Sequence, residues 1–398
     1  MRSTTLSIAA VGTAALLALS ACGSSDDDNK SSSGSSNDID AKCELSDPPT
    51  SDAAAPPTAT PAPIANATGK VGVILPDTTS STRYTLYDQP LLKKAFDAAG
   101  IQSDIQNAQG DTAKFQQIAQ SMIGEGVKVL IIDSIDQTSG AAVEQQAAAA
   151  GIQVIDYDRV NLGGSAAYYV SFDNENVGEL QAQTLVACLD ANKAKNPSVL
   201  LMDGGTDVDN NAVLFASGAK SVLDPQKDKV KVVSEAVVKG WKTANAAPTF
   251  TQALNAAGGQ VDGVLAANDD IANAVIGVLK ENGLAGHVVV TGQDSGVEGL
   301  QNILRGQQSM TIFKNVSYEA NTAANLAIAL ISGQDPSALG VTFAGDQIDP
   351  KNTKLKSVLL PAEVITYSNV KDVVDAGALK ASEICDGLED QCKDAGIS

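Results

Sequence analysis

Short apolar runs alternate with longer amphipathic stretches along most of the chain from about residue 70 onward. The apolar runs predict strands at 71–75, 101–106, 127–132, 154–155, 168–172, 198–202, 229–233, 263–266, 288–291 and 310–313. The amphipathic stretches predict helices near 87–99, 111–124, 139–150, 173–189, 210–223, 244–257, 271–282, 297–305 and 318–332. Strands alternating with helices specify a parallel, doubly wound sheet. The number of units exceeds one sheet, so we predict an α/β fold with two lobes and a cleft between them.

The N-terminus has a different pattern. Arg2 precedes an apolar run over 6–19, and Leu-Ser-Ala-Cys follows at 19–22. The run is too short for a mature membrane span and is typical of a signal peptide. The ending resembles a bacterial lipobox, which predicts cleavage before Cys22 and a lipid on its sulfur; an ordinary cleavage site is the alternative. Residues 23–69 are rich in Ser, Asp, Ala and Pro, and we expect a disordered tether there.

Net charge and the histidine and cysteine content argue against several kinds of ligand and partner. The 398 residues carry 27 basic and 47 acidic side chains, a formal charge of −20, which argues against a nucleic-acid partner. His287 is the single histidine, so no metal cluster is expected. Cys385 and Cys392 are expected to form a disulfide, as in other exported proteins; whether Cys43 and Cys188 pair is left open. We expect no cofactor, because neither GxGxxG nor GxxxxGK[ST] occurs.

The ends of the predicted strands carry the candidate chemistry. The stretch 154–159 begins apolar and ends in Asp158 and Arg159, and polar or aromatic side chains follow many of the other strands in the same way. The carboxyl ends of parallel strands face the ligand crevice. Carboxylates, amides, cations and an aromatic ring together fit a neutral ligand rich in hydroxyl groups, and both charge signs argue against a phosphorylated one. Nine of these residues are Arg83, Tyr84, Asp158, Arg159, Asn211, Trp241, Asn268, Asp294 and Lys314; Asp207, Asp209, Asn210, Asp269 and Gln293 stand at the same strand ends.

Several segments resemble the xylose-binding members of the periplasmic sugar-binding proteins of ABC transporters. They are YDR (157–159), YVSFDNENVGELQAQ (169–183), DVDNNAVLF (207–215), VKGW (238–241), AAND (266–269), TGQD (291–294) and MTIFK (310–314), in order over 70–367. The resemblance implies the type 1 periplasmic binding protein fold, with two Rossmann-like lobes and three hinge crossovers. It also implies that the lobes close over one monosaccharide, which an ABC permease then receives.

The same resemblance assigns the nine residues as ligand contacts. Tyr84 stands where these proteins commonly have Trp, which puts strict pentose choice in doubt. Crossovers are expected near 172–173, 310–312 and 339–341. Lobe 1 is then 70–171 plus 312–340, lobe 2 is 172–311 plus 341–367, and 368–398 is an extension. We expect a monomer held by its lipid at the outer face of the cytoplasmic membrane.

Two rival functions remain at this point. A glycoside hydrolase also lines its cleft with carboxylates, but it needs one with a raised pKa. Asp158 and Asp294 are each expected to be held ionised by a cation, Arg159 and Lys314 respectively, so we expect no catalytic residues. A sensor that presents the sugar-bound form to a receptor is the second rival. The sugar itself could be xylose or another aldose such as glucose, galactose or arabinose.

Overall fold

The computed structural model describes residues 38–51, 60–64, 67–339, 341, 343 and 348–397. The predicted signal peptide and the predicted lipidation site Cys22 lie outside the described residues. The predicted alternation is confirmed: the strands at 168–172, 263–266 and 310–313 and the helix at 210–223 have the predicted bounds. Asp111 and Asp173 cap α2 (Thr112–Gly124) and α4 (Asn174–Ala191) by accepting hydrogen bonds from backbone N–H groups of the first turn. In the described part of the chain no helix is long and apolar enough to cross a bilayer.

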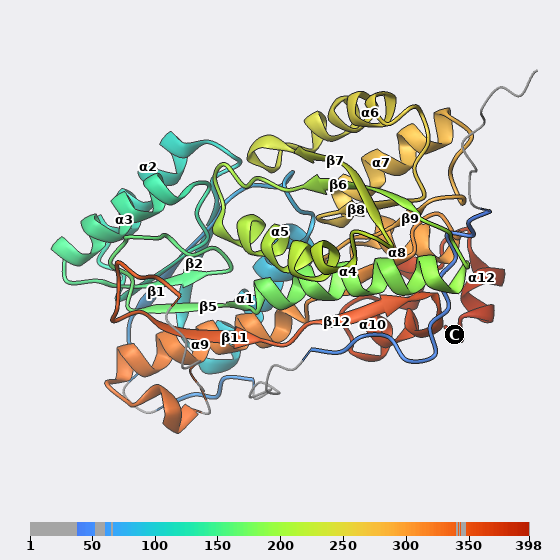
Figure 1. Ribbon diagram of the computed structural model, residues 1–398. Coiled ribbons are helices and arrows are strands. Elements are labelled where there is room, and N and C mark those ends of the chain that lie inside the picture. The colour runs from blue at the N-terminus through green and yellow to red at the C-terminus, as the bar shows by residue number, and fades with distance from the viewer. Residues whose placement is uncertain are drawn as a thin grey trace, which may run out of the picture. The chain divides into compact units, whose positions relative to one another are not determined.

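The first lobe is built on a parallel sheet in the order β11-β5-β4-β3-β1-β2. These strands are β1 (Lys70–Leu75), β2 (Gln102–Asn107), β3 (Val129–Ile132), β4 (Gln153–Tyr157), β5 (Tyr168–Phe172) and β11 (Lys356–Leu360). One face packs against α1 (Gln89–Ala99) and α9 (Val316–Ser332), and the other against α2 and α3 (Gln137–Ala149), as Figure 1 shows. The central strand β3 is wholly buried because helices cover both of its faces.

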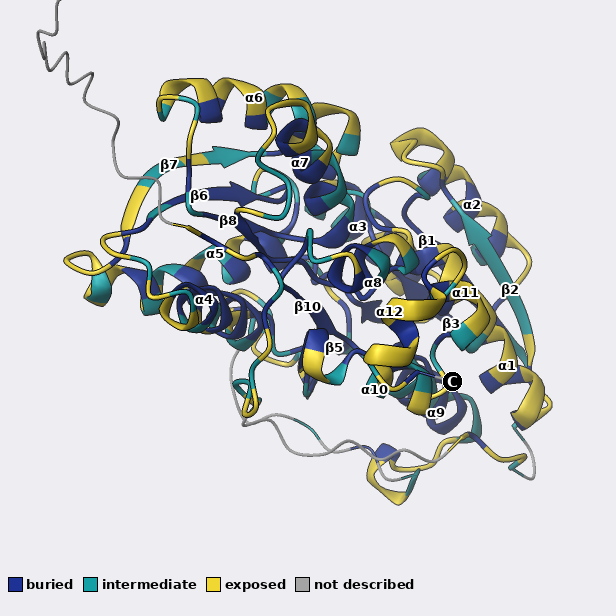
Figure 2. Ribbon diagram, turned by 90° about the vertical axis from the view of Figure 1, so that its right-hand side faces the viewer, coloured by how far each residue is buried: buried dark blue, intermediate teal, exposed yellow. Residues whose placement is uncertain are grey.

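The second lobe has a four-stranded parallel sheet in the order β7-β6-β8-β9. Its strands are β6 (Ser198–Asp203), β7 (Lys231–Val237), β8 (Gly263–Ala266) and β9 (Val289–Val290). Helices α4 and α5 (Asn210–Leu223) pack on one face, α6 (Ala246–Ala256) and α7 (Asp269–Glu281) on the other, and α8 (Val297–Leu304) packs beside α7. Figure 2 shows β6 and β8 buried and the edge strand β7 partly exposed.

A third, two-stranded ribbon lies between the lobes. It pairs β10 (Met310–Phe313) with β12 (Glu363–Thr366) in antiparallel register. The strand predicted at 310–313 therefore has the right bounds, but it does not belong to a parallel sheet. The chain passes between the lobes after β5, after β10 and between β11 and β12.

The expected third crossover at 339–341 differs from the structure. Strand β11 pairs in parallel with β5, so 356–360 belongs to the first lobe, whereas the sequence analysis placed 341–367 in the second. The chain crosses instead at 361–362, just before β12. An apolar run buried beside β5 decides this, because Val358 and Leu360 join the core of the first lobe.

The expected tether also differs over residues 38–51, here named the N-terminal arm. Ile39, Ala41 and Cys43 are buried, and Cys43 forms a disulfide with Cys188 of α4, with the two Cα atoms 5.6 Å apart. The Ala41 N–H donates to the Gly286 carbonyl at 3.0 Å. The arm ends at an antiparallel bridge between Thr50 and β12. The folded part therefore begins well before residue 70, on the second lobe.

The C-terminal extension packs on the second lobe beside α8. It contains η6 (Tyr367–Asn369), α10 (Lys371–Asp375), α11 (Ala381–Ile384) and α12 (Glu389–Asp394). Val370, Val373 and Ile384 bury their side chains against Leu300 and Ile303 of α8. The predicted disulfide Cys385–Cys392 is confirmed, and it joins the end of α11 to α12.

Helices α4 and α5 approach closely enough that a side chain at Gly178 has no room. An added Cβ would collide with the Phe215 carbonyl oxygen of α5, which is backbone and cannot rotate away. We expect Gly178→Ala to lower the free energy of unfolding by about 1–3 kcal/mol, measured by urea denaturation. The matched control is Gly277→Ala on the exposed side of α7, where nothing lies within 4 Å of the new Cβ. That change should stabilise the protein by about 0.5–1 kcal/mol, and a loss equal to that of Gly178→Ala would contradict the packing argument.

Candidate ligand-binding site

A pocket lies where the two lobes meet, and all nine predicted site residues line it. Arg83, Tyr84, Asp158 and Arg159 come from the first lobe. Asn211, Trp241, Asn268 and Asp294 come from the second, and Lys314 follows the connecting strand β10. The carboxyl ends of the strands thus converge as expected for open parallel sheets. Ser80, Ser81, Asp209, Phe215 and Gln293 complete the lining.

Asp158 stands at the end of β4 with a left-handed backbone, φ 59°. Its carboxylate accepts hydrogen bonds from Arg83 Nη1 at 3.0 Å and from the Tyr84 hydroxyl at 3.1 Å. Burial raises the pKa of Asp158, but Arg83, Lys314 and Arg159 together outweigh it and leave the pKa below its usual value. Asp158 is therefore an ionised acceptor. The expectation that Arg159 helps to hold Asp158 ionised agrees with this lowered pKa, but the direct ion pair is made by Arg83.

Arg83 is held by three carboxylates and is 2% exposed. Its Nε and Nη2 atoms donate to Asp88 at 3.0 and 2.7 Å, and Nη2 also donates to Glu319 of α9 at 2.6 Å. Burial raises the pKa of Glu319 to about 8, with the neighbouring carboxylates adding to the shift. With Nε and Nη2 taken by Asp88 and Glu319, Arg83 has Nη1 left to fix Asp158 at the pocket wall.

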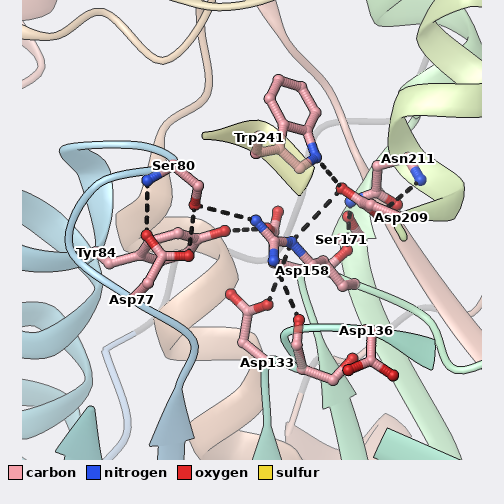
Figure 3. A network of polar contacts seen from close by, with 12 residues as sticks. Asp77, Ser80, Tyr84, Asp133, Asp136, Asp158, Ser171, Asp209, Asn211 and Trp241 are labelled. Carbon is pink, nitrogen blue, oxygen red and sulfur yellow. Dashed lines mark hydrogen bonds and ion pairs between the residues drawn. The ribbon is translucent and has the colours of Figure 1, made fainter. Parts of the chain in front are cut away.

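Arg159 lies across the cleft rather than beside Asp158. Its Nε atom is 3.7 Å from Asp133 of the first lobe and 3.5 Å from Asp209 of the second. Nη1 donates to the Ser134 carbonyl at 3.1 Å and Nη2 to the Ser80 hydroxyl at 3.2 Å. Asp133, Ser80 and Asp209, which are labelled in Figure 3, are the side chains within reach of this guanidinium. Arg159 therefore carries positive charge to the middle of the cleft and contacts both lobes.

Trp241 forms an aromatic wall on the second lobe. A Cβ at Gly204 or Gly205 would collide with its indole ring, so the two glycines give the ring its place against the backbone after β6. Its Nε1 donates to Asp209 at 2.9 Å, a contact drawn in Figure 3, and Phe215 packs edge-on at 6.4 Å between centroids. Such a fixed ring can stack on the C–H face of a sugar.

Another part of the pocket lining pairs a cation with a carboxylate. Lys314 Nζ is 2.9 Å from Asp294, and it also lies 5.6 and 5.9 Å from the ring centroids of Phe172 and Phe215. The other Asp294 oxygen accepts a hydrogen bond from Ser81. The Oε1 atom of Gln293, buried beside them, has no hydrogen-bond partner in the structure, and a ligand hydroxyl could supply one.

Asn211 and Asn268 are held by their side-chain amides. Asn211 Nδ2 donates to the Asp158 carbonyl at 2.8 Å, and Asn268 Oδ1 caps α7 through the Ile271 N–H at 2.9 Å. Asp156 and Tyr157, which lie at the end of β4 directly before Asp158, do not line the pocket. Asp156 bonds Asn161, and the Tyr157 hydroxyl donates to Asp88.

Five lining side chains are not among the nine predicted contacts. Asp209 and Gln293 stand beside predicted contacts in the strand-end segments, so their position was a usable signal. Ser80, Ser81 and Phe215 carried none, because serines in a loop and a phenylalanine in a helix are ordinary in any sequence. No group of three or more His, Cys, Asp or Glu side chains suited to a metal ion is present in the residues that the structure describes.

The pocket and the two-lobe fold agree with known proteins. The D-xylose-binding periplasmic protein of Escherichia coli (strain K12) is 36% identical over 300 residues, which are 75% of this chain and 87% of that protein. The multiple sugar-binding periplasmic receptor ChvE of Rhizobium radiobacter is 33% identical over 331 residues, 79% of this chain and 92% of that protein.

Solved structures agree with the same assignment. An ABC transporter solute-binding protein from Clostridium phytofermentans with bound β-D-glucose superposes with a TM-score of 0.71 and 28% identity, covering 79% of this chain and 99% of that one. A carbohydrate transporter solute-binding protein from Chloroflexus aurantiacus, in complex with D-glucose, gives 0.70 and 29%, covering 79% and 98%. The periplasmic binding protein domain matches residues 71–335. The resemblance noted in the sequence is confirmed, and the chain belongs to the periplasmic binding protein family.

Proposed function

We propose that this protein captures a neutral monosaccharide outside the cytoplasm and delivers it to an ABC permease. The observation that carries the proposal is the pocket lining. Carboxylate, amide and cationic side chains from the two lobes surround a space walled by Trp241 and Phe215. Such a set matches vicinal hydroxyls and one apolar ring face. D-Xylose is our first choice because of the Escherichia coli relative, and other aldoses are the alternative because relatives are named for several sugars.

Binding is proposed to proceed by hinge closure. The lobes are joined by the connections after β5, after β10 and between β11 and β12, so they can rotate about these points. A sugar that contacts both lobes stabilises the closed form, which the permease then engages. Micromolar affinity corresponds to about −8 kcal/mol, which several charge-assisted hydrogen bonds and one stacked ring can supply.

The anchor and the location are part of the proposal. We propose lipid attachment at Cys22, a monomeric protein, and a position on the outer face of the cytoplasmic membrane. Metabolic labelling with a radioactive fatty acid, compared with Cys22→Ser, tests the anchor: label retained in the variant would contradict it. A sensory role with the same sugar-bound form is compatible with this proposal. We expect no hydrolysis of aryl glycosides.

The single tryptophan gives a direct test of sugar binding. Trp241 is the only tryptophan in the chain and lines the pocket, so its fluorescence should change when a sugar stacks on it. We expect saturable changes on titration with xylose or another of glucose, galactose, arabinose and ribose, with micromolar midpoints. Free N-acetyltryptophanamide titrated in parallel is the control for direct quenching. The site assignment is abandoned if none of the five sugars changes the emission and calorimetry also detects no heat.

A further inference from the structure

The loop after β1 connects the two lobes through four consecutive residues. The Thr79 carbonyl accepts from the Thr243 hydroxyl at 2.6 Å, and the Ser80 carbonyl accepts from Asn268 Nδ2 at 2.9 Å. The Ser81 hydroxyl donates to Asp294 at 2.6 Å, and the Thr82 N–H donates to Asp270 at 2.9 Å. The loop belongs to the first lobe and its four partners to the second. These bonds therefore exist only while the lobes are together.

Hydrogen bonds within the first lobe fix the conformation of this loop independently of its contacts with the second lobe. Asp77 accepts hydrogen bonds from the backbone N–H groups of Thr79 and Ser80 at 2.7 and 2.6 Å, and from the Ser80 hydroxyl at 2.8 Å. Asn107 Nδ2 donates to the Asp77 carbonyl at 2.7 Å and ties this turn to the end of β2. A loop fixed in this way loses little conformational freedom when the lobes close.

The four bonds divide into an inner and an outer pair. Ser80, Ser81, Asn268 and Asp294 line the pocket, so their bonds respond to the ligand itself. The outer bonds join Thr79 to Thr243 and Thr82 to Asp270, and none of those four residues is among the described residues that line the pocket. Burial raises the pKa of Asp270 to about 6, so the carboxyl is mainly ionised at neutral pH and offers Thr82 a charged acceptor.

We propose that the 79–82 loop is a closure latch, in which Thr243 and Asp270 set the affinity for every ligand by one common factor without contacting any of them. The proposal rests on the sugar-binding function proposed above. The apparent dissociation constant equals the constant of the closed form divided by the fraction of protein that is closed. A bond that exists only in the closed form therefore scales all affinities equally, whereas a pocket residue changes their ratios.

The test compares the dissociation constants of two sugars in variants that lack one or both of the outer bonds. Asp270→Ala removes a charged acceptor and should weaken binding about 10-fold, and Thr243→Val removes a hydroxyl at constant shape and should weaken it about 3-fold. The double variant should lose more affinity than either single variant, and at most about the product of the two, 30-fold, because both bonds act on the same closing equilibrium. Each factor should be the same, within about 2-fold, for the two panel sugars that the wild type binds best, measured by calorimetry. The matched control is Glu298→Ala, which removes an exposed carboxylate close to Asp270 and breaks no bond that the structure records across the cleft. It should leave both affinities unchanged.

Small-angle scattering without sugar supplies the second readout. The double variant should have a larger radius of gyration than the wild type, because less of it is closed. A loss confined to one sugar, unchanged affinities, or an unchanged radius of gyration would each overturn the latch. If the wild type binds none of the sugars, the proposed function fails, and the scattering comparison still decides the latch. If the wild type binds only one of the sugars, the affinity loss for that sugar and the change in radius of gyration together test the latch.

Discussion

Asp158→Asn is expected to weaken sugar binding by about 2 kcal/mol or more, roughly 30-fold. The asparagine keeps the shape of the side chain and, with φ at 59°, tolerates the left-handed backbone better than alanine. It removes the charge that accepts from Arg83 and Tyr84 and that, in the proposed binding mode, would accept from a sugar hydroxyl. Calorimetric titration of the folded variant with the tightest sugar of the panel measures the loss.

The matched control for that experiment is Asp97→Asn. Asp97 is an exposed carboxylate on α1 that pairs with Lys93 one turn away, so its replacement changes net charge by the same amount far from the pocket. Exposed pairs of this kind contribute about 0.2–1 kcal/mol to stability, and sugar affinity should not change. Wild-type affinity in Asp158→Asn would refute the acceptor role, whatever the control gives.

The second large effect is expected on stability, from the Cys43–Cys188 disulfide. Its cysteines are 145 residues apart, whereas Cys385 and Cys392 are 7 apart. In the chain-entropy relation the long loop corresponds to about 5 kcal/mol of stabilisation and the short one to about 2.5 kcal/mol. We expect Cys43→Ser/Cys188→Ser to lose about twice the free energy of unfolding that Cys385→Ser/Cys392→Ser loses.

Urea denaturation of the oxidised proteins, followed by circular dichroism, compares the two double variants. Both replace sulfur by oxygen at two sites, so the comparison cancels the change of side chain to first order. Equal losses would mean that the Cys43–Cys188 disulfide stabilises the protein no more than the short-range Cys385–Cys392 disulfide does. Loop-closure entropy would then not explain its contribution. Sugar binding should survive in both variants, because no cysteine lines the pocket.

Much of the fold was predictable from the sequence because its signals are local. A buried parallel strand such as β3 is a continuous apolar run, and an N-cap such as Asp111 marks the start of a helix by its own chemistry. The strand at 310–313 was also found, but its antiparallel partner was not. The partner, β12, begins more than fifty residues after β10 begins. A short apolar run carries no information about which distant strand it will pair with.

The residues of the site were predictable from the sequence, but their contacts with one another were not. Strand ends can be read one at a time, so the nine lining residues could be named, but the bonds among them could not. Asp158 and Arg159 are adjacent in sequence, yet their backbone directions separate them, and Arg83 from 75 residues earlier takes the carboxylate. The N-terminal arm was missed for a related reason. Its composition resembles a tether, and what orders it is one distant cysteine in α4.

The N-terminal arm also determines how the molecule bears a mechanical load. A pull applied to the chain ahead of residue 38 reaches a covalent junction at Cys43, and α4 of the second lobe takes the tension there. Strand β1, which lies further along the chain and pairs with β2 and β3 in the first sheet, is shielded from that force. The second lobe then carries the tension from the N-terminus, and the first lobe stays free to rotate about the crossovers.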